Sequence, residues 1–402
     1  MRGIVVVGAG QAGASLGAKL RALGYDGALT LIGDEPVPPY QRPPLSKKYL
    51  LGEMEVERLY LRPLSFYTEQ DIELRTGVAV QLVDRAAKIL TLSDETTLAY
   101  AQLALTTGSR PRLLPEAIGG SLGGVYAVRT LADVDAMAME FRAGRRLLIV
   151  GGGYIGLEAA AVARLRGMHV TVIEMADRIL QRVAAAETSA YFRALHASHG
   201  VDFRESTGLA RLEGTQRVER AILADGSVLE VDCVVAGVGI TPDTRLAEAA
   251  GLAIENGIRV DELGRTNDPD IFAAGDCSSF PYRGGRVRLE SVPNAIDMGE
   301  AVAGAMLGGT EPYTARPWFW SDQYEVKLQI AGLNTGYDRV VVRPGIKEGT
   351  QSVWYFLGPE LLAVDAMNDP RAYMTGKRWI EAGVSPVAKA IADPASDLKT
   401  LA

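Results

Sequence analysis

The sequence predicts an α/β protein with two nucleotide-binding units and a C-terminal α+β part. Two glycine-rich turns, GAGQAG at 8–13 and GGGYIG at 151–156, each follow an apolar run and open a helical run of small residues. This order of strand, turn and helix begins a Rossmann-like βαβ unit. From about residue 317 the pattern changes to strands that alternate with turns, followed by a helical end. The 402 residues leave room for two or three domains.

The first unit begins with the strand IVVVG at 4–8, a helix predicted at 11–24 and the strand ALTLIGDE at 28–35. A proline-rich loop follows at 36–50, and its prolines should fix extended backbone and exclude a helix before Leu45. Shorter, more polar strands come next. They end in a buried strand that stops at Thr107 and Gly108.

The second unit runs from RRLLIV at 145–150 to HVTVIE at 169–174 and closes near CVVAGVGITPDT at 233–244. The segment DIFAAGDCSSF at 270–280 and a helix predicted at 291–309 then return to the first unit. We therefore expect three domains, with the second inserted into the first. Their predicted ranges are 1–109 with 241–316, then 110–240, then 317–402.

The spacing of the glycines suits a pyrophosphate. The first glycine permits a tight turn, the second lets the phosphates approach the backbone, and the third lets the helix pack on the strand. Phosphate oxygens then meet the free N–H groups of the helix N-terminus. An isolated match could be a turn that only packs, but here each one has the right neighbours. The six glycines are Gly8, Gly10, Gly13, Gly151, Gly153 and Gly156.

An acidic residue at the end of the next strand should bind a ribose diol. In the second unit this is Glu174, whose carboxylate repels a 2′-phosphate and so favours NADH over NADPH, although Arg178 lies four residues on. In the first unit either Asp34 or Glu35 could take this role, because Gly33 stands where the second unit has its acid. The first site is completed by the distant AAGDC segment, so we expect a long, resident ligand there, and FAD fits.

Composition narrows the function classes. The net charge of −7 argues against nucleic acid, and no run of about 18 apolar residues predicts a membrane span. A strand that begins at Gly3 leaves no room for a signal or transit peptide. Only two cysteines are present, Cys233 and Cys277, so a disulfide framework and a C-x4-C redox pair are excluded and a cytoplasmic location is expected.

Motifs along nearly the whole chain resemble those of the oxygenase-coupled, NADH-dependent ferredoxin reductases. They are the N-terminal G-x-G-x-x-G, PYQRPPLSK, TTG, GGGYIGLE, GVGITPDT, FAAGDC, ESVPNA and WFWSDQY. The resemblance implies a glutathione-reductase type of fold, tightly bound FAD, NADH as donor and a [2Fe-2S] ferredoxin as acceptor. That ferredoxin would feed a cytochrome P450 or a ring-hydroxylating oxygenase.

The resemblance also implies binding residues. Those for FAD are Gly8, Gly10, Ala12, Gly13, Asp34, Glu35, Arg42, Lys47, Val80, Thr107, Gly108, Arg129, Asp276, Val292 and Trp320. Those for NAD are Gly151, Gly153, Tyr154, Ile155, Gly156, Glu158, Glu174, Gly237 and Gly239. No metal site is expected: the H-x-x-H pair of His196 and His199 has no further ligands in sight, so solvated or packing roles are favoured.

Three residues are predicted to act in catalysis: Lys47, Glu158 and Tyr154. From sequence alone Lys47 would be a surface lysine, but the resemblance places it near flavin N5. Glu158 lies among small residues and would be costly to bury alone, so we expect it to pair with Lys47. Tyr154 would cover the flavin until nicotinamide displaces it, or be an interface tyrosine. Trp318 and Phe319 would line an electron exit or pack in the core.

The sequence is also compatible with other classes of flavoprotein. A disulfide reductase lacks the cysteine pair it needs. A rubredoxin reductase or another reductase would differ only in the acceptor, and a redox-responsive flavoprotein similar to apoptosis-inducing factor belongs to a different class. Two arginine groups, Arg142 with Arg145 and Arg146, and Arg283 with Arg286 and Arg288, could dock an acidic ferredoxin, although a solvated face is the plainer interpretation.

Overall fold

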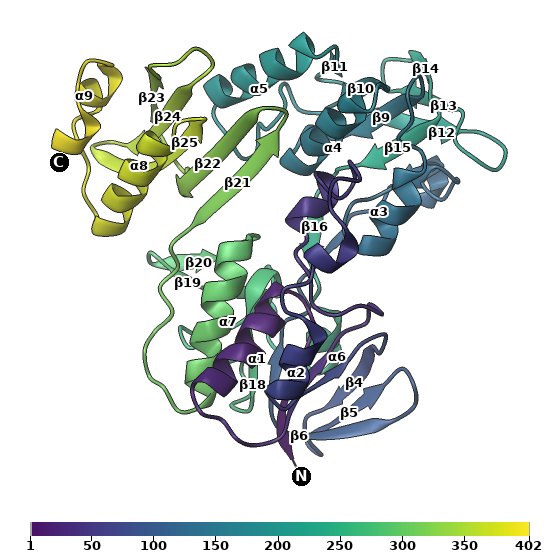
Figure 1. Cartoon of the computed structure of the whole chain (residues 1–402), viewed down its shortest axis with the longest axis vertical. Helices are drawn as coiled ribbons and strands as arrows, with labels where there is room; N and C mark the ends of the chain where they lie inside the picture. The colour runs from purple at the N-terminus through teal and green to yellow at the C-terminus, as the bar shows by residue number, and fades with distance from the viewer. Residues whose placement is uncertain (1, 402) are drawn as a thin grey trace. The chain divides into compact units, whose positions relative to one another are not determined.

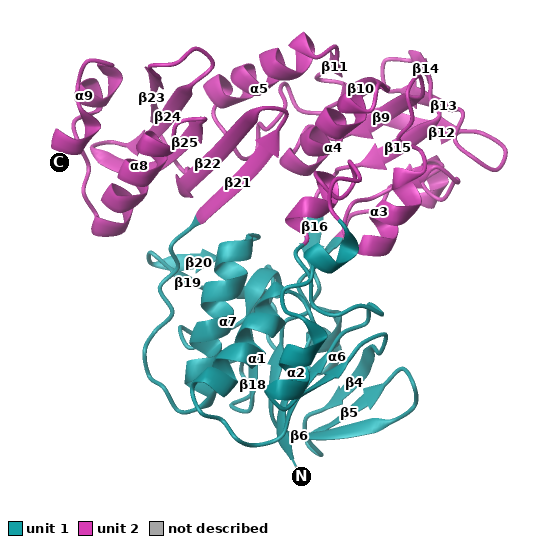
Figure 2. Cartoon of the chain, in the orientation of Figure 1, with its two compact units in different colours: residues 1–41, 55–110, 240–317 teal, residues 42–54, 111–239, 318–402 magenta. Residues whose placement is uncertain are grey.

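The computed structural model describes residues 2–401, which form two compact units (Figures 1 and 2). The first unit contains residues up to 41, 55–110 and 240–317. The second contains residues 42–54, 111–239 and 318–402. Residues 42–54, which we assigned from sequence to the FAD-binding domain, thus belong to the second unit, together with the C-terminal region.

The first unit is built on a seven-stranded sheet in the order β3-β2-β1-β6-β5-β4, with β18 paired to β6. The strands β3, β2, β1, β6 and β18 pair in parallel, and β4 and β5 add antiparallel pairs. Every residue of β1 is buried, as expected for a parallel strand that is covered on both faces. The strands are β1 (Gly3–Val7), β2 (Leu29–Ile32), β3 (Ile72–Arg75), β4 (Val80–Asp84), β5 (Ile89–Leu92), β6 (Thr97–Leu105) and β18 (Ile271–Ala273).

Two helices of the first unit, α1 and α7, pack side by side (Figure 1). A Cβ atom added at Gly299 of α7 would lie 2.7 Å from the carbonyl oxygen of Ala12 in α1, so glycine is needed for this approach. The helices are α1 (Gln11–Ala22), α2 (Leu64–Glu69), α6 (Arg245–Ala249) and α7 (Val292–Met306). The two helices predicted at 11–24 and 291–309 are confirmed with slightly shorter ends. The short strands are β7 (Ser109–Pro111), β16 (Ile240–Pro242), β17 (Ile258–Arg259), β19 (Ser278–Tyr282) and β20 (Gly285–Val287).

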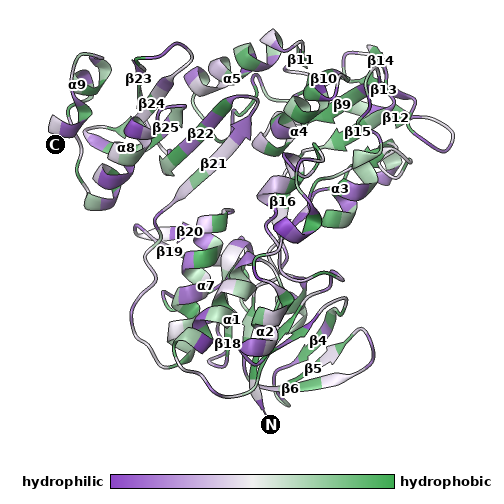
Figure 3. Cartoon of the chain, in the orientation of Figure 1, coloured by the Kyte–Doolittle hydropathy of each residue, from purple (hydrophilic) through white to green (hydrophobic). Residues whose placement is uncertain are grey.

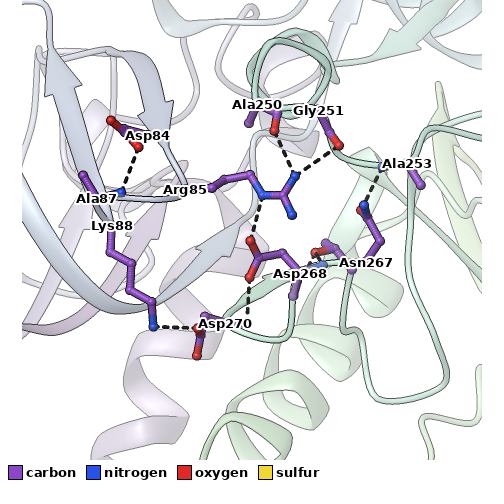
Figure 4. A network of polar contacts seen from close by, with 11 residues as sticks. Asp84, Arg85, Ala87, Lys88, Ala250, Gly251, Ala253, Asn267, Asp268 and Asp270 are labelled. Atoms are coloured by element: carbon purple, nitrogen blue, oxygen red, sulfur yellow. Dashed lines mark hydrogen bonds and ion pairs between the residues drawn. The ribbon is translucent and has the colours of Figure 1, made fainter.

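Figure 4 shows how distant stretches of the chain join within the first unit. The turn between β4 and β5 presents Arg85, which bonds Asp268 at 2.7 Å and the carbonyl oxygens of Ala250 and Gly251 at 3.2 and 3.3 Å. Lys88 pairs with Asp270. These contacts tie residues 84–88 to residues 250–270, which follow residues 111–239 in the sequence.

The second unit contains a five-stranded parallel sheet in the order β11-β10-β9-β15-β8 and an antiparallel sheet β12-β13-β14. Figure 3 shows the hydrophobic character of α4 and β9. The strands are β8 (Val125–Tyr126), β9 (Arg146–Val150), β10 (His169–Ile173), β11 (Asp202–Arg204), β12 (Leu209–Glu213), β13 (Arg220–Leu223), β14 (Val228–Glu230) and β15 (Cys233–Ala236). The helices are α3 (Leu131–Ala138), α4 (Tyr154–Leu165) and α5 (Ala186–Ser198).

The C-terminal part of the second unit is an antiparallel sheet in the order β21-β22-β25-β24-β23 followed by two helices. Its elements are β21 (Trp318–Gln323), β22 (Val326–Gly332), β23 (Arg339–Pro344), β24 (Gln351–Leu357), β25 (Glu360–Met367), α8 (Pro370–Ala382) and α9 (Ala388–Ala392). Strand β21 packs against α4. This confirms the predicted α/β class, with two Rossmann-like units and an α+β C-terminal part.

One prediction about the proline-rich loop is wrong. A 3₁₀ helix spans Pro43–Ser46, although we expected extended backbone before Leu45. The two prolines occupy its first two positions, where a helix needs no N–H donor and where the fixed φ of proline is already suitable. Prolines therefore begin this short helix instead of preventing it.

Among residues 2–401, the structure contains no helix of the length and apolar character that a membrane span requires.

Candidate functional site

The first glycine-rich turn has the geometry that a pyrophosphate requires. Gly8 has φ of +112°, and a Cβ atom there would lie 2.2 Å from the carbonyl oxygen of Thr106. A Cβ atom at Gly13 would lie 2.1 Å from the carbonyl oxygen of Gly8, whereas one at Gly10 would meet nothing within 4 Å. Gly10 is the N-cap of α1 and makes no side-chain cap hydrogen bond. The helix end is thus open to an anion.

A cavity of about 260 Å³ lies beside this turn in the first unit. Asp34, Val80 and Thr107 contribute to its wall. Glu35, in contrast, is not part of the wall, and its carboxylate accepts a hydrogen bond of 2.6 Å from the Tyr40 hydroxyl. This favours Asp34 as the ribose ligand. The full lining is Val7, Gly8, Ile32, Asp34, Val78, Ala79, Val80, Gln81, Thr107, Arg110, Asp243, Arg245 and Leu246.

The AAGDC segment lies next to the start of α1. A Cβ atom on Gly275 would lie 3.0 Å from the Ala12 Cβ, so the two segments are in close contact. Asp276 follows in a 3₁₀ turn and accepts a hydrogen bond of 2.9 Å from the Ser109 hydroxyl. Helix α7, which packs against this turn, begins at Val292. The first unit thus brings Ala12, Asp276 and Val292 into one neighbourhood, and the glycines and open helix end fit a dinucleotide such as FAD.

The second glycine-rich turn repeats this geometry in the second unit. Gly151 has φ of +105°, and a Cβ atom there would lie 2.5 Å from the carbonyl oxygen of Gly237. A Cβ atom at Gly156 would lie 2.5 Å from the Gly151 carbonyl oxygen, and one at Gly153 would meet nothing within 4 Å. Gly153 caps α4 without a side-chain cap from the described residues. This turn therefore fits a second dinucleotide.

The acid and the exposed side chain of this turn lie where a ligand could reach them. The Glu174 carboxylate accepts hydrogen bonds from the backbone nitrogens of Gly152 and Ala176 at 2.7 and 2.8 Å. Ile155, in the first turn of α4, is 45% exposed despite being apolar. The Arg178 guanidinium donates to the carbonyl oxygens of Ala184 and Ala185 and to the Ser189 hydroxyl, so it braces the start of α5.

Lys47 and Glu158 form the predicted ion pair. The Lys47 ammonium lies 2.9 Å from Glu158 Oε1, and Glu158 is 2% exposed. Ser46 donates to Oε2 and Ser321 to Oε1, each at 2.6 Å. A buried carboxylate is stable only when charge and hydrogen bonds replace its water, and all three groups do so here. Sequence reasoning missed Ser46 and Ser321, although both lie in the quoted motifs RPPLSK and WFWSDQY.

Tyr154 and the aromatic residues of β21 are partly buried in the second unit. The ring of Tyr154 is 5.1 Å from that of Phe319, and its hydroxyl is buried with no hydrogen-bond partner among the described residues. This burial raises the pKa of Tyr154 well above its ordinary value. On the other face of β21, the rings of Trp318 and Trp320 are 5.5 Å apart. The structure thus gives Tyr154 a packing role, and its part in ligand binding remains a prediction.

Four more of the predicted binding residues have defined surroundings or backbone conformations. Arg42 donates a hydrogen bond of 2.8 Å to the carbonyl oxygen of Arg129, which places both in one part of the second unit. Gly108 and Gly239 have positive φ, +69° and +101°, which explains why glycine stands there.

Both cysteines and one of the histidines, His196, are buried. Cys233 and Cys277 are fully buried, and burial raises the pKa of both thiols, that of Cys233 to about 12, so neither is suited to attack a disulfide. Burial lowers the pKa of His196 to about 4, and His199 stacks on Tyr324 with ring centroids 3.7 Å apart. His196 is thus buried and His199 partly exposed, in keeping with the solvated or packing roles expected for the H-x-x-H pair.

Two open glycine turns on separate Rossmann-like sheets, together with an ion pair between Lys47 and the buried Glu158, define a flavoprotein oxidoreductase that uses a pyridine nucleotide. Residues 2–299 match the family model described as pyridine nucleotide-disulphide oxidoreductase, and residues 318–402 match the reductase C-terminal model. The chain belongs to the pyridine nucleotide-disulphide oxidoreductase family. Its cofactors are therefore FAD and a nicotinamide dinucleotide.

The relatives of the chain are reductases of electron-transfer systems. It is 42% identical to rhodocoxin reductase of Rhodococcus erythropolis, over 98% of this chain and 93% of the relative. It is also 42% identical to putidaredoxin reductase of Pseudomonas putida, over 94% of this chain and 91% of that one.

Solved structures agree with this assignment. One is the covalent putidaredoxin reductase–putidaredoxin complex, which matches with a TM-score of 0.96 and 40% identity over 100% of this chain and 98% of that one. Another is the ferredoxin reductase for the CYP199A2 system from Rhodopseudomonas palustris, with a TM-score of 0.96 and 37% identity over the full length of both chains. The fold is therefore that of these reductases.

Proposed function

We propose that this chain carries electrons from NADH, through bound FAD, to a [2Fe-2S] ferredoxin that supplies a cytochrome P450 or a ring-hydroxylating oxygenase. The observation that carries the proposal is the pair of open glycine turns with different surroundings. The first borders a cavity of about 260 Å³ with Asp34 in its wall. The second presents Glu174 and an exposed Ile155. We assign FAD to the first and NADH to the second.

Bound FAD supplies the chemistry that links a two-electron donor to a one-electron acceptor. The protein contributes binding and electrostatics. The open N-terminus of α1 would neutralise the FAD pyrophosphate, and the α4 N-terminus would do the same for NADH. Glu174 would accept from a ribose hydroxyl and repel a 2′-phosphate. Lys47 would provide a fixed positive charge for the flavin, and Glu158 with its two serines holds that charge in place.

The names of the relatives support the acceptor class. Besides the two reductases above, relatives include the anthranilate 1,2-dioxygenase system ferredoxin–NAD(+) reductase component of Burkholderia cepacia, which is 40% identical over 98% of both chains. We extend this class of partner to the present chain. Its two buried, unreactive thiols are consistent with the reducing cytoplasm that the sequence predicts as its location.

Rubredoxin is the second candidate acceptor. A rubredoxin–NAD(+) reductase of Pseudomonas putida is 34% identical over 92% of this chain. The two acceptors both take single electrons, so the reductase itself would need no different chemistry for either.

Stopped-flow reduction of the purified yellow protein tests the proposal. NADH should bleach the bound flavin rapidly and NADPH slowly, and cytochrome c should then be reduced quickly only after a [2Fe-2S] ferredoxin is added. Rubredoxin in place of ferredoxin is the comparison arm. A flavin that NADH leaves unbleached contradicts the enzyme assignment, and slow reduction with a long-lived NADH complex favours a redox-responsive binding protein instead.

A further inference from the structure

A row of buried polar side chains extends from Glu158 into the body of the second unit. Ser321 donates to Glu158 Oε1 at 2.6 Å, and the Gln323 amide nitrogen lies 3.1 Å from the Ser321 hydroxyl. The Gln323 amide oxygen lies 2.7 Å from His196 Nε2. Ser321, Gln323 and His196 are each 0% exposed. Polar side chains at this depth are rare unless every one has a partner, as here.

The fold produces this row through two periodicities. Ser321 and Gln323 are two residues apart on β21, so their side chains lie on one face of the strand, which they share with Phe319. Glu158 and Tyr154 are four residues apart on α4, so they lie on one face of the helix. The Tyr154–Phe319 contact and the Glu158–Ser321 bond are therefore successive contacts between the same two faces. His196 approaches Gln323 from α5.

The direction of each hydrogen bond follows from Glu158. As the carboxylate partner of Lys47, Glu158 can only accept, so the single proton of Ser321 points toward it. Ser321 must then accept from Gln323, which turns the amide nitrogen toward the serine and the amide oxygen toward His196. An amide oxygen only accepts, so His196 must carry its proton on Nε2. Its other nitrogen, Nδ1, faces the Tyr324 hydroxyl at 3.5 Å.

We infer that Ser321, Gln323 and His196 form a directional hydrogen-bond chain that holds Glu158, and through it Lys47, in position. His196 is then a positioning residue for the ion pair although the imidazole does not touch either partner. Every donor in the chain points toward Glu158, so each bond polarises the next and favours negative charge at the carboxylate. The link to catalysis rests on the function proposed above, whereas the chain of bonds does not.

Histidine NMR tests the direction of the chain without any turnover. The sequence contains only three histidines, so the holoenzyme labelled with ¹⁵N-histidine gives few signals. His196 should show a single neutral form with the proton on Nε2, and its signals are assigned by their loss in the His196→Gln variant. His199 is an internal contrast, because its Nδ1 lies 2.9 Å from the Leu195 carbonyl oxygen and must donate there. A proton on His196 Nδ1, or an average of both forms, overturns the inference.

A matched pair of variants tests the positioning role. The Gln amide nitrogen reaches as far as histidine Nε2, whereas the Asn amide reaches only to Nδ1. His196→Gln should therefore keep the bond to Gln323 and reduce flavin with NADH within about twofold of the wild-type rate. His196→Asn should break the bond to Gln323 and thereby weaken the bond from Ser321 to the charged Glu158. Reduction should then slow about tenfold, the effect expected when a hydrogen bond to a charged group is weakened. The thermal denaturation midpoints of both holoenzymes show whether a slower rate of flavin reduction comes from a loss of stability instead.

The outcomes are distinct. Equal rates in the two variants contradict a positioning role for His196, because a residue that only fills space would not distinguish them. If NADH fails to reduce the wild-type flavin, the proposed function is lost while the NMR result still decides the hydrogen-bond chain.

Discussion

The Glu174 carboxylate accepts a hydrogen bond of 2.7 Å from the backbone nitrogen of Gly152. The side chain proposed to bind the ribose thus also contacts the turn proposed to bind the phosphates. We expect Glu174→Ala to lower the preference for NADH over NADPH about tenfold, because both a hydrogen bond to a charged acceptor and the repulsion of a 2′-phosphate are removed. The ratio of kcat/KM for the two nucleotides measures this. Asp177→Ala, which removes a nearby exposed carboxylate, is the control, and an unchanged ratio in Glu174→Ala contradicts the assignment.

Glu158→Gln should slow reduction by NADH while FAD stays bound. The amide keeps the shape of the carboxylate but leaves the Lys47 charge unpaired and poorly placed, and a loss of about 10- to 100-fold is expected for such a group. Stopped-flow absorbance of the flavin gives the rate, and the flavin-to-protein ratio gives the FAD content. Lys48→Met is the control, because it removes the charge of the exposed lysine next to Lys47 and leaves the Lys47–Glu158 pair in place. Wild-type kinetics in Glu158→Gln would return the residue to a purely structural role.

Gly299→Ala should destabilise the first unit. Its new methyl group would lie 2.7 Å from the Ala12 carbonyl oxygen, so α1 and α7 must separate, at a cost of about 1–3 kcal/mol. Gly304→Ala on the same helix is a demanding control, because a Cβ there meets nothing within 4 Å and alanine favours helix by up to about 1 kcal/mol. The midpoint temperature of thermal denaturation should therefore fall in Gly299→Ala and rise in Gly304→Ala. Similar shifts would show that the contact between α1 and α7 tolerates a methyl group.

The buried Asp365 should make stability depend on pH. It accepts hydrogen bonds from Tyr355 and from Thr188 at 2.8 Å, yet burial raises its pKa to about 6. A raised pKa means that the folded state binds the proton more tightly than the unfolded chain. The resulting stability is fully present below the unfolded pKa near 4 and is lost as pH rises through about 6.

Asp365→Asn removes this titration. The free energy of unfolding of the variant, relative to wild type, should therefore rise between pH 4 and 7, by up to about 3 kcal/mol for a pKa raised from 3.8 to about 6. Urea titrations of both proteins at several pH values give the difference, from which the titrations of the other carboxyl groups cancel. A difference that stays constant with pH contradicts the raised pKa.

Local sequence rules predicted the units of this fold because each rule acts over a few residues. The glycine spacing at 8–13 and 151–156 predicted two tight turns, and the structure contains both. Each has one glycine, Gly10 or Gly153, beside which there is open space. The partnership of Lys47 and Glu158 was not a local prediction: the resemblance placed Lys47 near the flavin, and the cost of burying a carboxylate alone then indicated Glu158 as its partner. The 3₁₀ helix at Pro43 was missed because proline excludes helix only beyond its first turn.

The polar chain behind Glu158 could not be predicted in the same way. Ser321 and Gln323 alternate on β21 as any half-exposed strand residues do, and nothing local shows that they turn inward. Their partner His196 is 127 residues from Gln323 and comes from α5. Only tertiary packing brings these residues together. The different surroundings of Asp34, in the cavity wall, and Glu35, bonded to Tyr40, could likewise not be predicted from the sequence.

The pairing of β18 with β6 has a consequence for how the chain is made. Phe272 lies beside Ala104 in the first sheet, so residues 105–271, including all of residues 111–239 of the second unit, separate these two paired positions in the chain. A ribosome that builds the chain from its N-terminus exposes β6 long before β18 exists. The edge of that sheet stays open while residues 111–239 emerge and begin to fold. Closing so distant a pair is slow, and the contacts of Arg85 and Lys88 with the later segment can form only in that last step.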